Sequence, residues 1–300
     1  MNRRRLCVLV LLVCAAFKAQ TPPEQRNAIL ISWDGAGGEH VRANLAAGKL
    51  PHLARLVAQG GLVDIEVTGH GTDTKPGHAQ MLTGYDGNLT GVYSNAKFGP
   101  IPRGYSIFER LQQAFGKNSL VTVMLTGKGP NLGSQAPDGG SAEPFYLVRP
   151  SLTVWDGDQI RSARVVGERA VRYIDRYAGK ERFFLFVHFP DVDVGGHYHG
   201  EDSGDYDRAL GECDAWLGKM VAALESRKVD DRTLVYVTAD HGFDKGTKRH
   251  ASATRIFLGT NDARVSRPGE QRDIAPTVLS AMGVDLTKIV PRLPGKVLAK

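Results

Sequence analysis

The apolar positions of the chain fall into short continuous runs that predict buried β-strands. Each run holds four to seven residues, many of them β-branched or aromatic. Runs without an alternating pattern are typical of strands covered on both faces, as in a parallel sheet. The runs are residues 27–33, 62–67, 119–125, 183–189, 233–238 and 255–258.

Between these runs, apolar residues recur at helical spacing. Pro51 stands in the first turn of one such segment and Gly60 and Gly61 end it, which are positions that proline and glycine favour. The alternation predicts an α/β protein with a mostly parallel central sheet and helices on both faces. The helical segments are residues 50–59, 77–83, 107–114, 158–177 and 206–225.

Residues 126–144 break this alternation, because they are rich in glycine and proline and show no periodicity. Long loops of this kind in compact domains are usually functional or mobile, so we expect this one at the rim of an active site. The sequence shows no internal repeat and no linker that would divide it. Residues 21–300 are therefore expected to form a single domain.

The N-terminal residues 1–20 have the pattern of a secretory signal. Arg3, Arg4 and Arg5 precede an apolar run over residues 6–17, which is too short for a comfortable membrane span. Ala16 and Ala19 are both imperfect cleavage sites, so the exact cut is left open. We expect export to the periplasm or the medium, with no stable membrane association after cleavage.

Composition argues against two features, specific binding to nucleic acid and an internal disulfide. The net charge of +6 includes Arg3, Arg4, Arg5 and Lys18, and removing these four positive charges leaves +2, so no specific binding to nucleic acid is expected. Outside the signal the chain has one cysteine, Cys213, which cannot form an internal disulfide. Its helical segment predicts a small core residue there.

Acidic residues and histidines follow the predicted strands and predict a metal site. Asp34 ends the first strand, Asp240 and His241 follow residues 233–238, and His250 precedes the last core strand. Ligands gather at the carboxyl ends of strands in open α/β sheets, and carboxylate and imidazole are ligands of Zn²⁺ and related ions. The strand at residues 183–189 is followed by a segment containing the further candidates Asp191, Asp193, His197 and His199, and His188 lies within that strand.

Thr74 stands where a strand gives way to a helix, which exposes its hydroxyl to the positive end of the helix dipole. A threonine attacks phosphate only when a base or a metal stabilises its alkoxide. Each residue also has a plainer interpretation. Thr74 can cap the helix, and Asp34 and the pair Asp240 and His241 can form turns. Asp193, His197, His188 and His199 can be solvated loop residues or partners of ligands. Their occurrence together at one edge of a sheet favours the metal site.

With these residues in this order, the chain resembles the type I phosphodiesterase/nucleotide pyrophosphatase branch of the alkaline phosphatase superfamily. The resemblance extends over nearly everything after the signal and rests on short motifs that recur in order. These are Asp34-Gly35 after a strand, Thr74-Lys75-Pro76-Gly77-His78 with Thr83-Gly84, Gly91-Val92-Tyr93-Ser94-Asn95, Asp193-Val194-Gly195-Gly196-His197, Asp240-His241-Gly242, and Asp273-Ile274-Ala275-Pro276-Thr277-Val278 at the start of a C-terminal helix.

The resemblance implies an alkaline-phosphatase-like three-layer sandwich and a hydrolase of phosphate esters with two divalent metal ions, Zn²⁺ first and Mn²⁺ as the alternative. Thr74 is implied as the nucleophile that forms a phospho-enzyme, which water then hydrolyses. Asn95, with the backbone N–H of Thr74, is implied to hold a phosphate oxygen, and Lys75 is either a rim charge or a solvated lysine. The implied ligands of one metal are Asp34, Thr74, Asp240 and His241, and those of the other are Asp193, His197 and His250.

One departure from the family limits what can be carried over. Nucleotide pyrophosphatases have a long insert before the last metal histidine, whereas His250 here follows His241 almost at once. The cap is therefore reduced, and nucleotide specificity does not transfer. Asp191 competes with Asp193 as a ligand, although the spacing to His197 favours Asp193.

The alternatives come from three classes. A phosphomonoesterase or phosphonate hydrolase of the same superfamily is the main enzymatic alternative to a phosphodiesterase. A sulfatase shares the fold but derives its nucleophile from Cys or Ser, which Thr74 does not provide. A non-catalytic binding protein on this scaffold is expected to have lost ligands, and none is missing here. The expected partner is a small-molecule phosphate ester, and the oligomeric state is left open.

Overall fold

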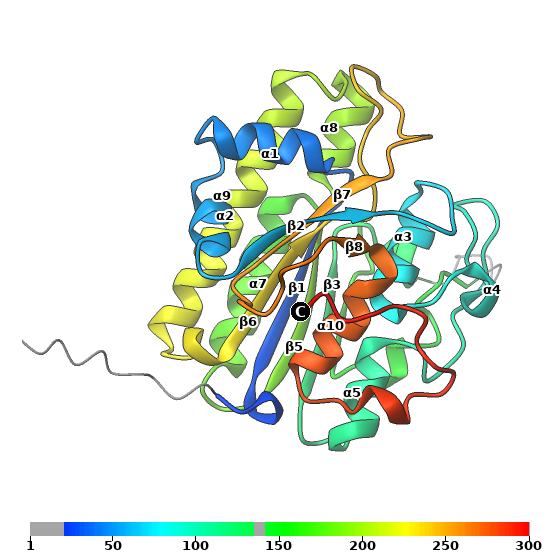
Figure 1. Ribbon diagram of the computed structural model, residues 1–300, viewed down its shortest axis with the longest axis vertical. Coiled ribbons are helices and arrows are strands. Elements are labelled where there is room, and N and C mark those ends of the chain that lie inside the picture. Colours follow the sequence, from blue (N-terminus) through cyan, green and yellow to red (C-terminus); the bar gives the residue numbers. More distant parts are fainter. Residues whose placement is uncertain (1–20, 135–141, 300) are drawn as a thin grey trace, which may run out of the picture.

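The computed structural model describes residues 21–134 and 142–299 and shows one eight-stranded sheet with helices on both faces (Figure 1). Its strand order is β4-β3-β5-β1-β6-β7-β2-β8, and β7 alone runs antiparallel to its neighbours. The strands are β1 (Asn27–Trp33), β2 (Gly61–Glu66), β3 (Val121–Thr126), β4 (Val154–Asp156), β5 (Phe183–Phe189), β6 (Thr233–Thr238), β7 (Arg255–Thr260) and β8 (Gly269–Glu270).

Helices form the two outer layers. One layer contains α1, α2, α7, α8 and α9, and the other contains α3, α5 and α10 (Figure 1). The three-layer α/β arrangement confirms the expected fold class. The helices are α1 (Gly38–Ala46), α2 (Pro51–Val57), α3 (Thr74–Thr83), α4 (Gly87–Thr90), α5 (Ile107–Phe115), α6 (Gly129–Leu132), α7 (Ala163–Tyr177), α8 (Asp191–His199), α9 (Gly204–Ser226) and α10 (Ile274–Ala281).

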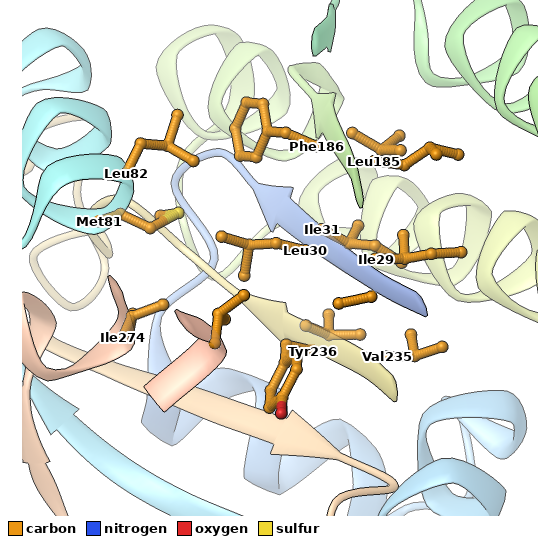
Figure 2. Close-up of a cluster of buried hydrophobic side chains, with 14 of the residues drawn as sticks. Ile29, Leu30, Ile31, Met81, Leu82, Leu185, Phe186, Val235, Tyr236 and Ile274 are labelled. Carbon is orange, nitrogen blue, oxygen red and sulfur yellow. The ribbon is translucent and has the colours of Figure 1, made fainter. Parts of the chain in front are cut away.

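The core lies on both faces of the central strand β1, all of whose residues are buried. Figure 2 shows Leu30 directed toward Met81 and Leu82 of α3, while Ile29 and Ile31 lie on the opposite face. Fully burying one such side chain contributes roughly 1.5–3 kcal/mol. Because β1 is buried on both faces, the sequence there is continuously apolar, and the strand is held firmly up to the residue that follows it.

The predicted strands agree with the structure, and β1, β5 and β6 have the predicted bounds. Cys213 is buried on α9, as expected. Two segments differ. The helix expected from residue 158 begins at Ala163, because the preceding residues pair with the chain after β3 through Ile160 and Arg161. The segment after β5, considered as a loop, forms helix α8.

The expected long loop at residues 126–144 contains the short helix α6, and residues 135–141 of it lie outside the described part of the chain. The expected signal at residues 1–20 also lies outside the described residues. Within the described parts, no helix is both long and apolar enough to cross a membrane.

Candidate metal centre

Three neighbouring strands deliver acidic side chains to one edge of the sheet. Asp34 follows β1, Asp193 lies in the helix after β5, and Asp240 follows β6. Since β1 pairs with both β5 and β6 in parallel, their carboxyl ends lie side by side, and the Asp34 N–H continues the ladder to the Phe189 carbonyl at 3.0 Å. Two groups of candidate ligands result, each with its ligand atoms within 4.8 Å of one another: Asp34, Asp240 and His241, and Asp193, His197 and His250.

The first group is fully buried. The Nε2 atom of His241 lies 3.6 Å from Asp34 Oδ1 and 3.4 Å from Asp240 Oδ2. The backbone N–H of Gly35 donates to Asp240 Oδ1 at 3.1 Å, which fixes that carboxylate. Gly35 has φ +78°, and a Cβ there would lie 2.9 Å from the Phe243 ring, so the turn after β1 requires glycine.

The second group reaches the surface. Asp193 and His197 lie one turn apart on α8 and so share a helix face, with His197 Nε2 3.3 Å from Asp193 Oδ1. The Nε2 atoms of His197 and His250 are 3.2 Å apart. The His197 side chain is 45% exposed, whereas Asp193 is buried. Solvent therefore reaches the centre from this side.

All three histidines are held in the same orientation by the backbone. Their Nδ1 atoms lie against carbonyl oxygens, which only accept, so each Nδ1 must carry the proton. The distances are 3.0 Å from His241 to Gly242, 3.1 Å from His197 to Lys248 and 2.6 Å from His250 to Thr72. In its neutral form each ring then presents the lone pair of Nε2 to the cluster, which is the arrangement that metal-binding histidines adopt.

The atoms turned toward the cluster lack partners of their own. Among the described residues, Asp34 Oδ1, Asp193 Oδ1, Asp240 Oδ2 and His241 Nε2 are buried without a hydrogen bond. A buried polar atom without a partner costs about 1–3 kcal/mol, more if it is charged. The Nε2 atoms of His197 and His250 face each other at 3.2 Å, so one cation could be bound by both rings. The donor set thus fits divalent cations at both groups.

The electrostatics of the carboxyl groups indicate the same need for positive charge. Burial, together with the nearby charge of Asp34, raises the pKa of Asp240 to about 8. Burial also opposes the charged form of Asp34, but the ammonium of Lys128 and a hydrogen bond from His188 hold the pKa of Asp34 well below its ordinary value. A cation beside Asp240 would stabilise its charged form in the same way.

Lys128 is a site residue that the sequence analysis did not identify. Its Nζ lies 2.7 Å from Asp34 Oδ2 and 2.5 Å from Asp193 Oδ2, so it joins the two groups. The expectation that residues 126–144 approach the active site is confirmed for Lys128. The available signal was its position just after β3, whose carboxyl end lies beside that of β5.

Thr74 is the first residue of α3 and is buried. Asp73 occupies the N-cap position, so the interpretation of Thr74 as the cap is wrong. The first turn of α3 packs on the first group, because a Cβ at Gly77 would lie 2.7 Å from the carbonyl oxygen of Asp240. His78 links the two, with Nδ1 2.8 Å from the Thr74 carbonyl oxygen and 3.4 Å from Asp240 Oδ2.

Asn95 lies against the same helix start. The side-chain Oδ1 of Asn95 accepts from the Lys75 N–H at 3.0 Å, and the Asn95 N–H donates to Asp73 Oδ2 at 2.9 Å. Lys75 is neither a free rim charge nor a solvated lysine. It is buried, paired with Glu143 Oε2 at 2.8 Å, and its Nζ lies 3.2 Å from the centre of the Phe98 ring.

The structure also shows where the remaining candidates lie. His188 is buried and supports Asp34, with Nε2 2.9 Å from Asp34 Oδ2. Asp191 is turned away from the centre and accepts from the backbone N–H of Ala163 at 2.5 Å, at the start of α7. His199 is exposed. Of the two aspartates that competed, Asp193 is therefore the one in the cluster.

Comparison with known proteins gives a family match over most of the chain. The model of the type I phosphodiesterase / nucleotide pyrophosphatase family matches residues 28–292. Bis(5'-adenosyl)-triphosphatase enpp4 of Mus musculus is 22% identical over 73% of this chain and 48% of its own length. An uncharacterized pyrophosphatase/phosphodiesterase of Schizosaccharomyces pombe is 22% identical over 77% of this chain and 47% of its own length. The chain thus spans about half the length of these curated relatives.

Solved structures share the fold at low identity. Alkaline phosphatase from the Antarctic bacterium TAB5 superposes with a TM-score of 0.62 at 16% identity, covering 89% of this chain and 100% of that one. A 2-O GAG sulfatase superposes with a TM-score of 0.65 at 14% identity, covering 92% of this chain and 73% of that one. These matches confirm an alkaline-phosphatase-like fold and do not by themselves distinguish phosphate from sulfate esters.

Proposed function

The chain belongs to the type I phosphodiesterase / nucleotide pyrophosphatase family, and we propose that it is a metal-dependent hydrolase of phosphate esters. The observation that carries this proposal is the convergence of unpaired ligand atoms from two groups at the carboxyl edge of the sheet. The first group, with Thr74, is proposed to hold one divalent ion and the second group to hold another. Zn²⁺ is the first candidate, because the donor set mixes imidazole and carboxylate, and Mn²⁺ is the alternative.

Two divalent ions at these groups would polarise the phosphoryl oxygens and favour the alkoxide form of a nearby hydroxyl. The residues of the chain do the positioning. Asp34 and Asp240 are held by His188 and Gly35, and the first turn of α3 rests on the Asp240 backbone. Thr74 is thereby presented at the positive end of a ten-residue helix, where developing negative charge is favoured.

In the proposed reaction, the hydroxyl oxygen of Thr74 forms a bond to phosphorus as the bond to the leaving oxygen breaks. The proton of the Thr74 hydroxyl passes to solvent, the leaving alkoxide takes up a proton from solvent and departs as the alcohol, and the phosphoryl group remains on Thr74 until water hydrolyses it. Asn95 is proposed to bind the phosphoryl group during this step. Its Oδ1 is engaged by the Lys75 N–H, which leaves the amide NH₂ to donate to a non-bridging oxygen.

Diesters are proposed ahead of monoesters and phosphonates, because Asn95 is neutral and the side with His197 is open to a second substituent. A sulfatase is not proposed, although sulfatases share the fold, because the proposed nucleophile Thr74 is neither Cys nor Ser. The name of the mouse relative refers to a nucleotide substrate of that protein. The short connection between His241 and His250 gives no support for a nucleotide specificity here.

The test compares Thr74→Ala and Thr74→Ser with wild-type protein on bis-nitrophenyl phosphate, with added Zn²⁺ or Mn²⁺. The alanine variant is expected to lose turnover while keeping its melting temperature within a few degrees, and the serine variant is expected to keep measurable activity. An alanine variant with near-normal rates would show that water attacks directly. A parallel screen of nitrophenyl monoesters, phosphonates and sulfates identifies the preferred class.

Export is a separate proposal, supported by the basic and apolar pattern of residues 1–20. The mature protein is proposed to be periplasmic or secreted, with no stable membrane association after signal cleavage. Intact-mass analysis of protein from its native host should show the loss of roughly the first fifteen or more residues, the usual length of a signal. A full-length chain in the membrane fraction would contradict it.

A further inference from the structure

The backbone around Lys128 is fixed on both sides. Gly127 donates its N–H to the His188 carbonyl at 3.1 Å and accepts from the Arg161 N–H at 2.9 Å. A Cβ at Gly129 would lie 1.1 Å from the carbonyl oxygen of Gly157, so the chain passes that residue in close contact. The stem of Lys128 therefore starts from one place in the fold, held between β5 and residues 157–161.

The side chain of Lys128 enters the centre instead of extending into solvent. It is 14% exposed, and its ammonium contacts Asp34 of the first group and Asp193 of the second. In the described parts of the chain, no other lysine or arginine pairs with a carboxylate of either group. Lys75, the alternative from the nucleophile motif, is already paired with Glu143.

We propose that Lys128 is a specificity-determining residue that binds a non-bridging oxygen of the substrate's phosphoryl group. This inference rests on the proposed function, because it places the phosphoryl group between the two ligand groups. Divalent ions on Asp34 and Asp193 would compensate those carboxylates and leave the three N–H donors of Lys128 for the substrate. The flexible four-carbon stem allows the ammonium to move a short way while the backbone stays in place.

The charge of Lys128 acts unequally on different esters. A phosphate monoester carries close to two negative charges at neutral pH and a diester carries one, so a single ammonium attracts the monoester about twice as strongly. Removing the ammonium should therefore lower turnover of the monoester more than turnover of the diester. Lys128 thus determines how well the centre tolerates doubly charged substrates and the inorganic phosphate that hydrolysis releases.

The experiment uses Lys128→Met, which removes the charge and keeps the length of the stem. Lys97→Met is the matched control, because Lys97 is exposed, lies over the Tyr93 ring and makes no contact with the centre among the described residues. Metal content is measured first, and then the affinity of the metal-loaded proteins for inorganic phosphate by calorimetry. We expect Lys128→Met to bind as many equivalents of metal as wild type and to lose at least tenfold in phosphate affinity, with Lys97→Met unchanged.

The ratio of kcat/KM values for nitrophenyl phosphate and bis-nitrophenyl phosphate gives the second measurement, and it should fall at least threefold in Lys128→Met. Lys128→Arg, which keeps a positive charge, should retain most of the phosphate affinity and provides the test if the methionine variant does not fold. Unchanged phosphate affinity, an equal loss in Lys97→Met, or loss of metal from Lys128→Met would each overturn the inference. If phosphate binding depends on Lys128 but the wild-type protein hydrolyses no ester, the proposed function fails and the anion site stands.

Discussion

The three histidines of the centre show how backbone contacts prepare side chains for a cation. Each ring donates its Nδ1–H to a carbonyl oxygen and directs Nε2 toward the cluster. Sequence spacing marks these histidines as candidates but does not show the direction of a ring. That direction depends on backbone carbonyl groups that are distant in sequence from the ring they contact: Lys248 for His197 and Thr72 for His250. A backbone carbonyl leaves no trace in the pattern of residue types.

Replacing one of these rings should remove one metal ion and leave the other. His250→Ala deletes a ligand atom of the second group but none of the first, which is buried and held by its own contacts. Elemental analysis of dialysed protein should show bound metal falling from two equivalents towards one. His199→Ala is the matched control, since His199 is exposed on the same helix as His197. Two full equivalents in His250→Ala would exclude His250 from the ligand set.

The raised pKa of Asp240 predicts how the stability of the metal-free protein, prepared with a chelator, depends on pH. Because its pKa in the folded protein is about 8, compared with 3.8 for an ordinary Asp, folded Asp240 keeps a proton that the unfolded chain has already lost. The stability that this group contributes is complete below pH 3.8 and is lost as pH rises through about 8. The pKa of His241 is also raised, despite its burial, by Asp240 and Asp34, so its contribution falls with pH in the same direction.

Thermal unfolding in the presence of a chelator should therefore show a melting temperature that falls as pH rises from 5 to 8. In this range folded Asp240 keeps its proton and the unfolded chain does not, so each rise in pH favours the unfolded state. Added Zn²⁺ should remove most of that slope, because the cation stabilises the charged carboxylate. Asp240→Asn should flatten the slope in the chelated protein, whereas exposed Asp64→Asn should not. A chelated protein whose melting temperature rises over this range would contradict the assignment of a protonated Asp240.

Strands and helices differ in how much of them the sequence predicts. The strands β1, β5 and β6 are buried on both faces, so their sequences are continuously apolar. The ends of these apolar runs predict the bounds of the strands. Helix α8 was missed because it contains Gly195 and Gly196, which weaken helix propensity, and because its inner face carries ligands in place of apolar residues. The spacing of Asp193 and His197 by four residues was the remaining helical signal.

The contact between α3 and the end of β6 predicts a sensitive position. Gly77→Ala places a Cβ 2.7 Å from the Asp240 carbonyl oxygen, so the helix start carrying Thr74 must move. A displacement of about 1 Å at reacting groups can cost on the order of a hundredfold in rate, so we expect a loss of that order in kcat. Gly211→Ala in α9 meets no atom within 4 Å and should be neutral or slightly stabilising. Wild-type kcat in Gly77→Ala would show that the position of α3 is not critical.

For the molecule as a whole, the order of the strands determines which residues meet. Parallel pairing of β5, β1 and β6 unites side chains that are about 50 to 200 residues apart in the chain, and the motifs were sufficient to anticipate this. The motifs did not identify Lys128, because one lysine in a glycine-rich segment has no distinguishing pattern beyond its position just after β3. Its position depends on the packing of Gly127 and Gly129 against distant backbone, which only the folded chain reveals.

The openness of the centre on the side of His197 and His250 leads to the last prediction, that diesters are better substrates than monoesters. Sites specialised for monoesters usually bind the phosphate through an arginine fork. Here the described residues near the helix start offer the neutral Asn95, and Lys128 offsets only one charge of a dianion. The short connection between His241 and His250, together with the 45% exposure of the His197 side chain, leaves space for a second substituent.

We therefore expect a higher kcat/KM for bis-nitrophenyl phosphate than for nitrophenyl phosphate, with both activities lost on chelation and restored by Zn²⁺ or Mn²⁺. Lys128→Met should widen the gap, since it removes the charge that favours the monoester. A monoester preference of tenfold or more, about 1.4 kcal/mol of transition-state stabilisation, would make the diesterase assignment wrong. The two metal groups and the role of Thr74 would be unaffected by that result, because they determine attack on phosphorus and not the number of ester substituents that the site accepts.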